Sequence, residues 1–357
     1  MLRIPYSLIR SFFTKSVVFP LVAALSLATV TGCDEGSGFA PGFSTDPDFR
    51  REHFLQPQPR DVDVLWVIDT SCSMLDEQEA LATNGPNFFE FFLEADVPFH
   101  IGATSTNVDE DDTEGLDGRL AGEPGFLTLD TPDLGTAFLE RTLLGIDDHH
   151  NWEKGLQAAW KALEVLGETD NDGFLRDDAN LSIIVVSDEP DFSETDVGQH
   201  EDLIKWQDFV DWLDVFKGED RAQQTQLSAV VGISEDGFDN PDGCNLNPDP
   251  EHWGEGALRG DGYLEAALAT GGSYQSICTE NWATVLSRMG LISAGLSDTF
   301  SLDEQPVPAT IEVEVAGRSE SRWTYKPDVN GVYFTELSAI PLSGEQVTIR
   351  YRVARPL

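Results

Sequence analysis

The hydrophobic pattern of this chain changes its period near residue 298. Before that point, an unbroken apolar run at 64–68 and mainly apolar runs at 181–186 and 227–233 alternate with segments whose apolar residues recur at helical spacing. Short continuous apolar runs are typical of strands buried on both faces, and their alternation with helices predicts a parallel sheet. We therefore expect an α/β domain over residues 61–297, with a doubly wound, mainly parallel sheet flanked by helices.

Helical spacing marks four segments of this domain. The first, 75–95, contains Asn-Gly-Pro at 84–86, so we expect an interrupted helix there, because proline lacks the backbone donor. The others are 152–166, 197–216 and 282–296, where large apolar side chains line one face. These stripes indicate helices that pack on the core.

After residue 298 the apolar residues alternate with polar ones. This period of two predicts half-buried strands of a small antiparallel β module over residues 298–357. One predicted strand carries acids on its polar face and another carries bases, so we expect the two to pair. The acids are Glu312 and Glu314, and the bases are Arg350 and Arg352.

Polar residues follow two of the buried apolar runs. Asp-Thr-Ser-Cys-Ser occupies 69–73 and Ser-Asp-Glu-Pro-Asp occupies 187–191. Open α/β sheets bind ligands at the carboxyl ends of their strands, and carboxylate and hydroxyl oxygens suit a hard divalent cation. The alternative interpretation of 69–71 is a polar turn or a helix cap. The predicted metal ligands are Asp69, Ser71, Ser73 and Asp188, with Asp191 in reserve.

The Asp-x-Ser-x-Ser loop resembles the metal-ion-dependent adhesion site of von Willebrand factor A domains. In that family both hydroxyls touch the ion, the Asp supports them, and further loops supply a Thr and an Asp. The resemblance implies a bound divalent cation, Mg²⁺ in the first place and Mn²⁺ or Ca²⁺ as alternatives. It also implies a protein partner that presents Asp or Glu to the open position of the ion.

The second loop departs from the family pattern. His150 stands where the family has Thr, within Asp-Asp-His-His-Asn at 147–151. As a ligand, His would favour transition ions; the alternative is a loop histidine bonded to nearby carboxylates. The metal role of His150 is therefore doubtful, as is that of Asp191.

Two further stretches resemble bacterial cell-envelope lipoproteins that carry an A domain followed by a small β module. The first is Gly-Phe-Leu-Arg-Asp-Asp-Ala (173–179) before Ile-Ile-Val-Val-Ser-Asp-Glu (183–189). The second is Ala-Thr-Gly-Gly-Ser-Tyr-Gln-Ser-Ile-Cys (269–278) before Trp282. The resemblance implies the same order of domains here.

The N-terminus indicates export. Basic residues precede an apolar run at 16–30, which is short for a membrane span, and Val-Thr-Gly-Cys33 follows. This resembles the bacterial lipoprotein box and implies a signal peptide over residues 1–33 with lipid on Cys33; the alternative is an uncleaved anchor. Residues 34–60, rich in Gly, Pro and Ser, are expected to form a flexible tether. The expected location is the bacterial cell envelope, on the periplasmic face or the cell surface, with the membrane contacted only through the lipid.

Export also bears on the cysteines. We expect a disulfide between Cys244 and Cys278, because an oxidising compartment favours pairing. Two separate thiols, or pairing of either residue with Cys72, are the alternatives.

Charge and motifs exclude two classes of function. The chain carries 64 acidic against 22 basic residues, a net charge of −42, which repels nucleic acid. No nucleophile elbow, phosphate loop or His-Glu-x-x-His motif occurs, so no enzyme activity is predicted. The sequence favours a lipid-anchored binding protein with an adhesion-type metal site. The alternative is a metal-independent structural scaffold in a cell-envelope assembly.

Overall fold

The computed structural model describes residues 48–108, 115–146, 152–193, 205–234, 243–244 and 256–354. The chain divides into two compact units, Met1–Thr45 and Asp46–Leu357, and all described residues belong to the second. The predicted signal peptide and Cys33 therefore lie outside the described residues. Within the described ranges, no helix combines the length and apolar character needed to cross a bilayer.

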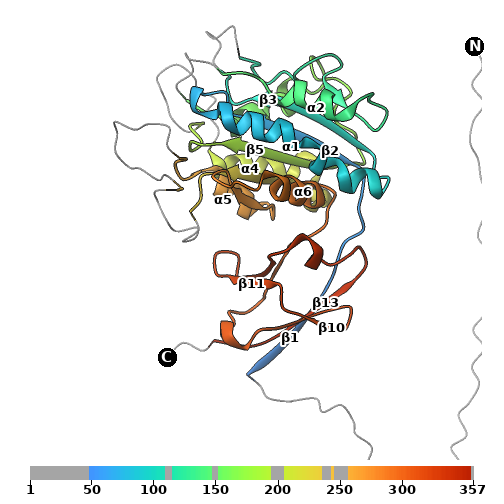
Figure 1. The fold of residues 1–357 in the computed structure, drawn as a ribbon, viewed down its shortest axis with the longest axis vertical. Coiled ribbons are helices and arrows are strands. Elements are labelled where there is room, and N and C mark those ends of the chain that lie inside the picture. Colours follow the sequence, from blue (N-terminus) through green and yellow to red (C-terminus); the bar gives the residue numbers. More distant parts are fainter. Residues whose placement is uncertain are drawn as a thin grey trace, which may run out of the picture. The chain divides into compact units, whose positions relative to one another are not determined.

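A six-stranded sheet forms the centre of the larger part, with strand order β4-β3-β2-β5-β6-β7 (Figure 1). All neighbouring pairs are parallel except β3 and β4, which are antiparallel. Every residue of β2 is buried, as expected for a strand covered on both faces. The strands are β2 (Val62–Ile68), β3 (Phe99–Ser105), β4 (Phe126–Leu127), β5 (Asn180–Ser187), β6 (Thr225–Val231) and β7 (Tyr274–Ser276).

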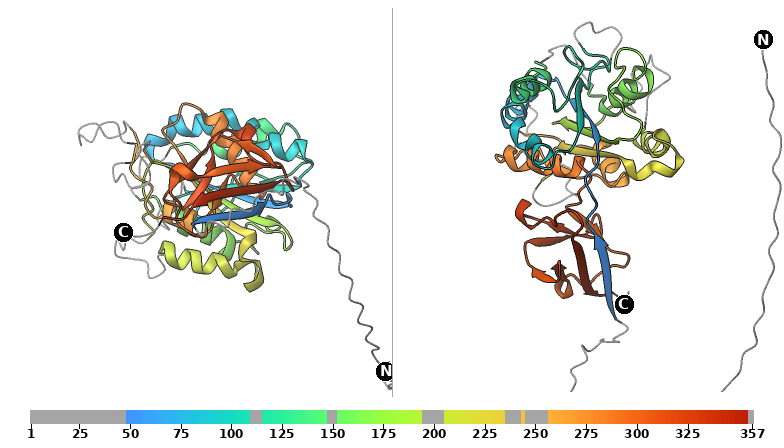
Figure 2. Two further views of the ribbon diagram at one scale, coloured as in Figure 1. Left: turned by 90° about the horizontal axis from the view of Figure 1, so that it is seen from below. Right: turned by 90° about the vertical axis from the view of Figure 1, so that its right-hand side faces the viewer.

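Helices cover both faces of this sheet (Figures 1 and 2). Trp66 of β2 packs in one core with α1, α2 and α6, and its neighbours Leu65 and Val67 pack in the other with α3, α4 and α5. Side chains alternate between the faces of a strand, so one buried strand supplies both cores. The helices are α1 (Leu75–Glu94), α2 (Leu134–Thr142), α3 (Gly155–Trp160), α4 (Trp206–Phe216), α5 (Tyr263–Ala269) and α6 (Trp282–Ser293).

The predicted interruption of the first helix is wrong. Helix α1 runs for 20 residues through Pro86. Gly85 lies so close to α2 that an added Cβ would be 2.4 Å from the Phe138 ring, and Phe88 and Phe92 are fully buried. Burying an aromatic side chain stabilises by about 1.5–3 kcal/mol, so two of them offset the roughly 3 kcal/mol cost of an internal proline.

The C-terminal part consists of two antiparallel sheets, of order β1-β13-β9-β10 and β11-β12-β8. The predicted pairing of the acidic and basic strands is confirmed, because β9 lies antiparallel to β13. Glu312 stands opposite Arg350, 3.2 Å from it. The strands are β8 (Thr299–Ser301), β9 (Glu312–Val315), β10 (Arg318–Glu320), β11 (Trp323–Lys326), β12 (Gly331–Phe334) and β13 (Gln346–Arg352).

Part of the expected tether is a strand, which corrects the prediction of flexibility over residues 34–60. Residues 49–55 form β1 (Phe49–Leu55), which pairs along its whole length with β13. Phe54 packs against Phe300, with ring centroids 5.4 Å apart. The β module therefore takes one strand from before the α/β domain; residues 34–47 lie outside the described part.

The predicted disulfide between Cys244 and Cys278 is confirmed. It joins the segment at 243–244 to the residues that follow β7. Cys72 is a free and exposed thiol.

Candidate functional site

Asp69 connects the two predicted metal loops. Strands β2 and β5 run parallel with Ile68 beside Val186, so the residues after them meet at the same edge of the sheet. The Asp69 carboxylate accepts a hydrogen bond from the Ser187 hydroxyl at 2.6 Å and another from the Ser71 backbone N–H at 2.8 Å. Asp69 is fully buried, and both of its oxygens hold neighbouring loops in place.

The two predicted hydroxyl ligands lie side by side. A short 3₁₀ turn, Cys72–Met74, follows the strand, and the hydroxyls of Ser71 and Ser73 are 3.1 Å apart. The Ser73 hydroxyl also lies near the Asp188 carboxyl, on the loop after β5, and its effect is to lower the pKa of that group. One carboxylate oxygen of Asp188, Oδ1, is buried and has no hydrogen-bond partner among the described residues. The structure thus brings all four predicted residues together.

Burial shapes the electrostatics of this cluster. It raises the pKa of Asp69 to about 6, against the opposing effect of the hydrogen bonds from Ser187 and Ser71. It raises the pKa of Asp188 to about 7, and the charge of Asp69 raises it further. Both shifts mean that ionising the two carboxyls together is unfavourable unless a positive charge lies beside them.

Glu153 is the acidic residue that sequence analysis missed. It is 1% exposed and lies just before α3, where the Phe192 N–H donates to its backbone carbonyl at 2.7 Å. Burial raises its pKa to about 10, and the charges of Asp69 and Glu189 add to the shift. Its Oε2 atom has no hydrogen-bond partner among the described residues. Glu153 lies in the segment 152–166 that the sequence predicts to be a helix, and no local signal distinguishes it from an ordinary polar helix residue.

Asp191, the reserve ligand, is engaged elsewhere. Its Oδ1 accepts hydrogen bonds from the Leu156 N–H at 3.2 Å and from the Ser193 hydroxyl at 2.9 Å. These bonds hold the start of α3, where the first backbone N–H groups lack partners within the helix. The other doubtful ligand, His150, lies outside the described residues.

The donors present fit a hard cation. Two adjacent hydroxyls lie near the Asp188 carboxyl, one oxygen of which has no partner, and such oxygen ligands suit Mg²⁺ or Ca²⁺. Across the described ranges, no group of three or more His, Cys, Asp or Glu side chains surrounds a common ion position. Any ion at this edge would therefore depend on serine hydroxyls for part of its coordination.

No family model and no curated protein matches this chain. Solved structures similar to it include the pilus adhesin SpaC from Lactobacillus rhamnosus GG, with 13% identity over 87% of this chain and 43% of that one, at a TM-score of 0.36. The pilus adhesin RrgA from Streptococcus pneumoniae has 9% identity over 86% and 59%, at a TM-score of 0.34. Proximal thread matrix protein 1 from the mussel byssus has 10% identity over 68% and 48%, also at 0.34.

The chain thus spans less than two thirds of the length of each of these proteins. TM-scores of this size are too low to assign a fold family or a function.

Proposed function

We propose that this chain is an extracytoplasmic binding protein that holds a divalent cation and binds a partner through it. Ser71, Ser73 and Asp188 would coordinate the ion, with Asp69 supporting the two loops. The observation that carries the proposal is the buried, unpartnered Asp188 Oδ1 beside two adjacent hydroxyls. Buried polar atoms in proteins nearly always have a partner, and a cation supplies one.

The cation would also relieve the repulsion between the buried carboxyls. Mg²⁺ is the first expectation, with Mn²⁺ and Ca²⁺ as alternatives, because all donors are oxygens. Neutral hydroxyl ligands leave much of the positive charge on the ion, so it attracts an anion from outside. The proposed partner is a protein that presents Asp or Glu. Although the chain has a net charge of −42, salt screens that field over about 8 Å at physiological ionic strength.

An A-domain fold and an exported, lipid-anchored state are part of the proposal. The sheet order and the position of the site at the carboxyl ends of β2 and β5 support the fold. The disulfide supports an oxidising compartment. Anchoring through Cys33 in a bacterial cell envelope rests on the sequence of residues 1–33.

The test is calorimetric titration of the protein with Mg²⁺, Mn²⁺ and Ca²⁺. We expect one-site binding that weakens at least about tenfold in Asp69→Ala, because Asp69 orients both loops. Asp61→Ala is the matched control: Asp61 has a half-exposed side chain near the opposite end of β2, and its loss should leave ion affinity unchanged.

Equal ion affinity in the wild type and in folded Asp69→Ala would contradict the proposed site. If the wild type binds no ion, and a partner captured from solution stays bound in chelator, the metal-independent scaffold would replace this proposal.

A further inference from the structure

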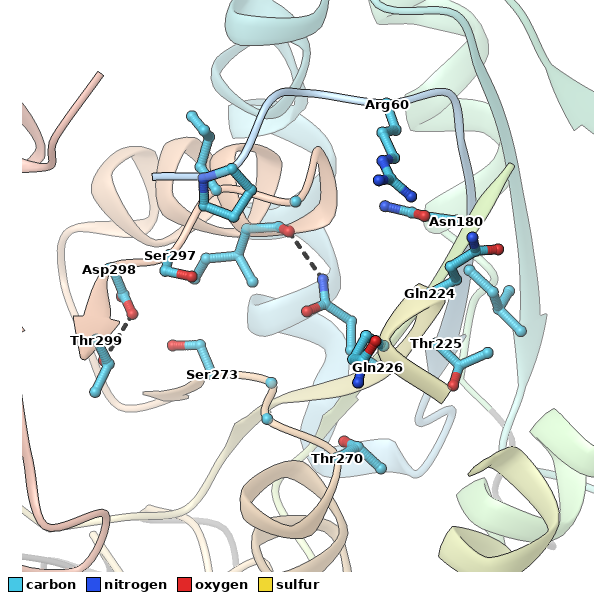
Figure 3. A pocket seen from close by; sticks show the side chains of 18 of the residues that line it. Arg60, Asn180, Gln224, Thr225, Gln226, Thr270, Ser273, Ser297, Asp298 and Thr299 are labelled. Carbon is cyan, nitrogen blue, oxygen red and sulfur yellow. Dashed lines mark hydrogen bonds between the residues drawn. The ribbon is translucent and has the colours of Figure 1, made fainter. Parts of the chain in front are cut away.

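A second candidate site lies at the opposite edge of the six-stranded sheet. A cavity of about 730 Å³ opens at the amino ends of β5, β6 and β7 (Figure 3). We call it the amino-edge pocket; its polar lining includes Arg60, Asn180, Arg221, Gln224, Gln226 and Ser273.

The amino-edge pocket is independent of the candidate metal site. Asn180 is the first of the eight residues of β5, and Ser187, which contacts Asp69, is the last. With a rise of about 3.3 Å per residue, the two sites are roughly 23 Å apart. Ligands at the two sites can therefore be tested separately.

Two buried amide oxygens of this pocket lack partners. Asn180 Oδ1 and Gln224 Oε1 face away from solvent and have no hydrogen-bond partner within the described ranges, but both side chains are partly exposed, so a rotation of either amide brings its oxygen to the pocket. By contrast, Gln226 is held by a hydrogen bond from its Nε2 to the Ile292 carbonyl at 2.8 Å (Figure 3). Unpaired amide oxygens are acceptors, and hydroxyl groups are donors that match them.

The pocket also offers positive charge in a strongly acidic chain. The side chain of Arg60 points into the pocket toward Asn180 (Figure 3), and it forms no ion pair or hydrogen bond with the described residues. Its backbone N–H donates to the Ala294 carbonyl at 3.4 Å, which helps to fix its position. The acid on the far wall, Asp298, is already paired with Arg288 at 2.7 Å. The unpaired charge that remains is cationic, although the chain carries 64 acidic and only 22 basic residues.

We propose that the amino-edge pocket binds a short acidic saccharide. Its carboxylate would pair with Arg60, and its hydroxyls would donate to Asn180 Oδ1 and Gln224 Oε1 once each amide turns its oxygen toward the pocket. Among the described residues that line the pocket none is aromatic, so a neutral sugar would find no ring to stack on. The lining has more amide, hydroxyl and charged side chains than apolar ones, which favours a polyhydroxylated acid over a peptide. The volume lies within the usual range of ligand sites, about 300–1,000 Å³.

The experiment is calorimetric titration of the full chain in detergent, with EDTA present so that no cation site contributes. The probes are trisaccharides of galacturonic, glucuronic and mannuronic acid, together with their methyl esters. We expect at least one of the acids to bind. Its methyl ester should bind at least about tenfold more weakly than the acid, because the charge-assisted hydrogen bonds to arginine are lost.

Arg60→Gln should weaken binding of the acid by about tenfold or more, because it removes the guanidinium that would pair with the carboxylate and changes no other charge. Arg51→Gln is the matched control; Arg51 is exposed on β1, outside the pocket lining, and its replacement should leave the affinity unchanged. Thermal melting of both variants checks that each is folded.

Three results would overturn the proposal. One is failure of all three acidic trisaccharides to bind at millimolar concentration. Another is an affinity that does not depend on the charge, seen either as equal affinity of the protein for the acid and its ester or as equal affinity of the wild type and Arg60→Gln for the acid. The third is tighter binding of a triglutamate peptide that is lost in Arg60→Gln, which would assign the pocket to acidic peptides.

Discussion

At the scale of single residues, the candidate metal site gathers acids that burial makes hard to ionise. Asp69, Glu153 and Asp188 come from three separate segments, and burial is the largest cause of the raised pKa in each. Glu153, with a pKa of about 10, keeps its proton at neutral pH when no cation is present. The state of these protons therefore couples stability, pH and ion binding.

Glu153→Gln should stabilise the metal-free protein at pH 8. A carboxyl whose pKa is raised on folding binds its proton more tightly in the folded state. The free energy of unfolding therefore falls as pH rises from about 4.5, the ordinary glutamate value, toward about 10. Gln removes this titration, so we expect a gain of more than about 1 kcal/mol at pH 8 in EDTA and little change at pH 5.

Urea unfolding at the two pH values measures this effect. Glu90→Gln, at an exposed position of α1, is the matched control and should change neither value. Equal stability of the wild type and Glu153→Gln at pH 8 would refute the raised pKa of Glu153.

At the scale of elements, α6 joins the α/β domain to the β module through one buried arginine. Arg288 is 1% exposed and donates hydrogen bonds to Asp298 Oδ2 at 2.7 Å, to the Phe334 carbonyl at 3.0 Å and to the Thr335 carbonyl at 3.2 Å. Asp298 itself is 4% exposed. One helix side chain thus satisfies a buried carboxylate and two backbone acceptors of the following module.

Arg288→Ala should lower the free energy of unfolding by about 3–5 kcal/mol, because it leaves the buried Asp298 without its ion-pair partner. Arg318→Ala, at an exposed position of β10, is the matched control and should cost less than about 0.5 kcal/mol. Chemical denaturation measures both. A loss below about 1 kcal/mol for Arg288→Ala would show that the two parts do not depend on this residue.

At the scale of the whole molecule, the β module is built from both sides of the α/β domain. Strand β1 precedes that domain in the chain, and β13 is close to the C-terminus. Gln56, the residue directly after β1, donates from its Nε2 to the carbonyls of Ser297 and Pro341, each at 2.9 Å. The chain therefore enters and leaves the α/β domain at the module.

A chain that begins at Pro57 should be less stable than one that begins at Asp46. It lacks β1 and Gln56, so the full length of β13 loses its edge partner and Phe300 loses its contact with Phe54. We expect a lower melting temperature and faster proteolysis within 298–354. Identical melting of the two chains would mean that β1 contributes nothing to the stability of the module.

Much of the local structure could be predicted from the sequence, because its signals lie within a few residues. The apolar run at 64–68 and the polar residues after it located β2 and the site loop, since burial on both faces demands continuous apolar residues. Alternation in the C-terminal part predicted the pairing of β9 with β13. The disulfide between Cys244 and Cys278 was also predicted.

The rest was decided only by contacts between distant parts of the chain. Ser187, which holds Asp69, is 118 residues away from it, and Glu153 enters the same cluster from a third segment. Residues 49–55, expected to belong to a tether, form a strand because they pair with β13. Helix α1 continues past Pro86 because the residues around it pack against Phe138. Local patterns determine which residues must be buried, but which buried groups meet depends on the free energy of packing the whole chain.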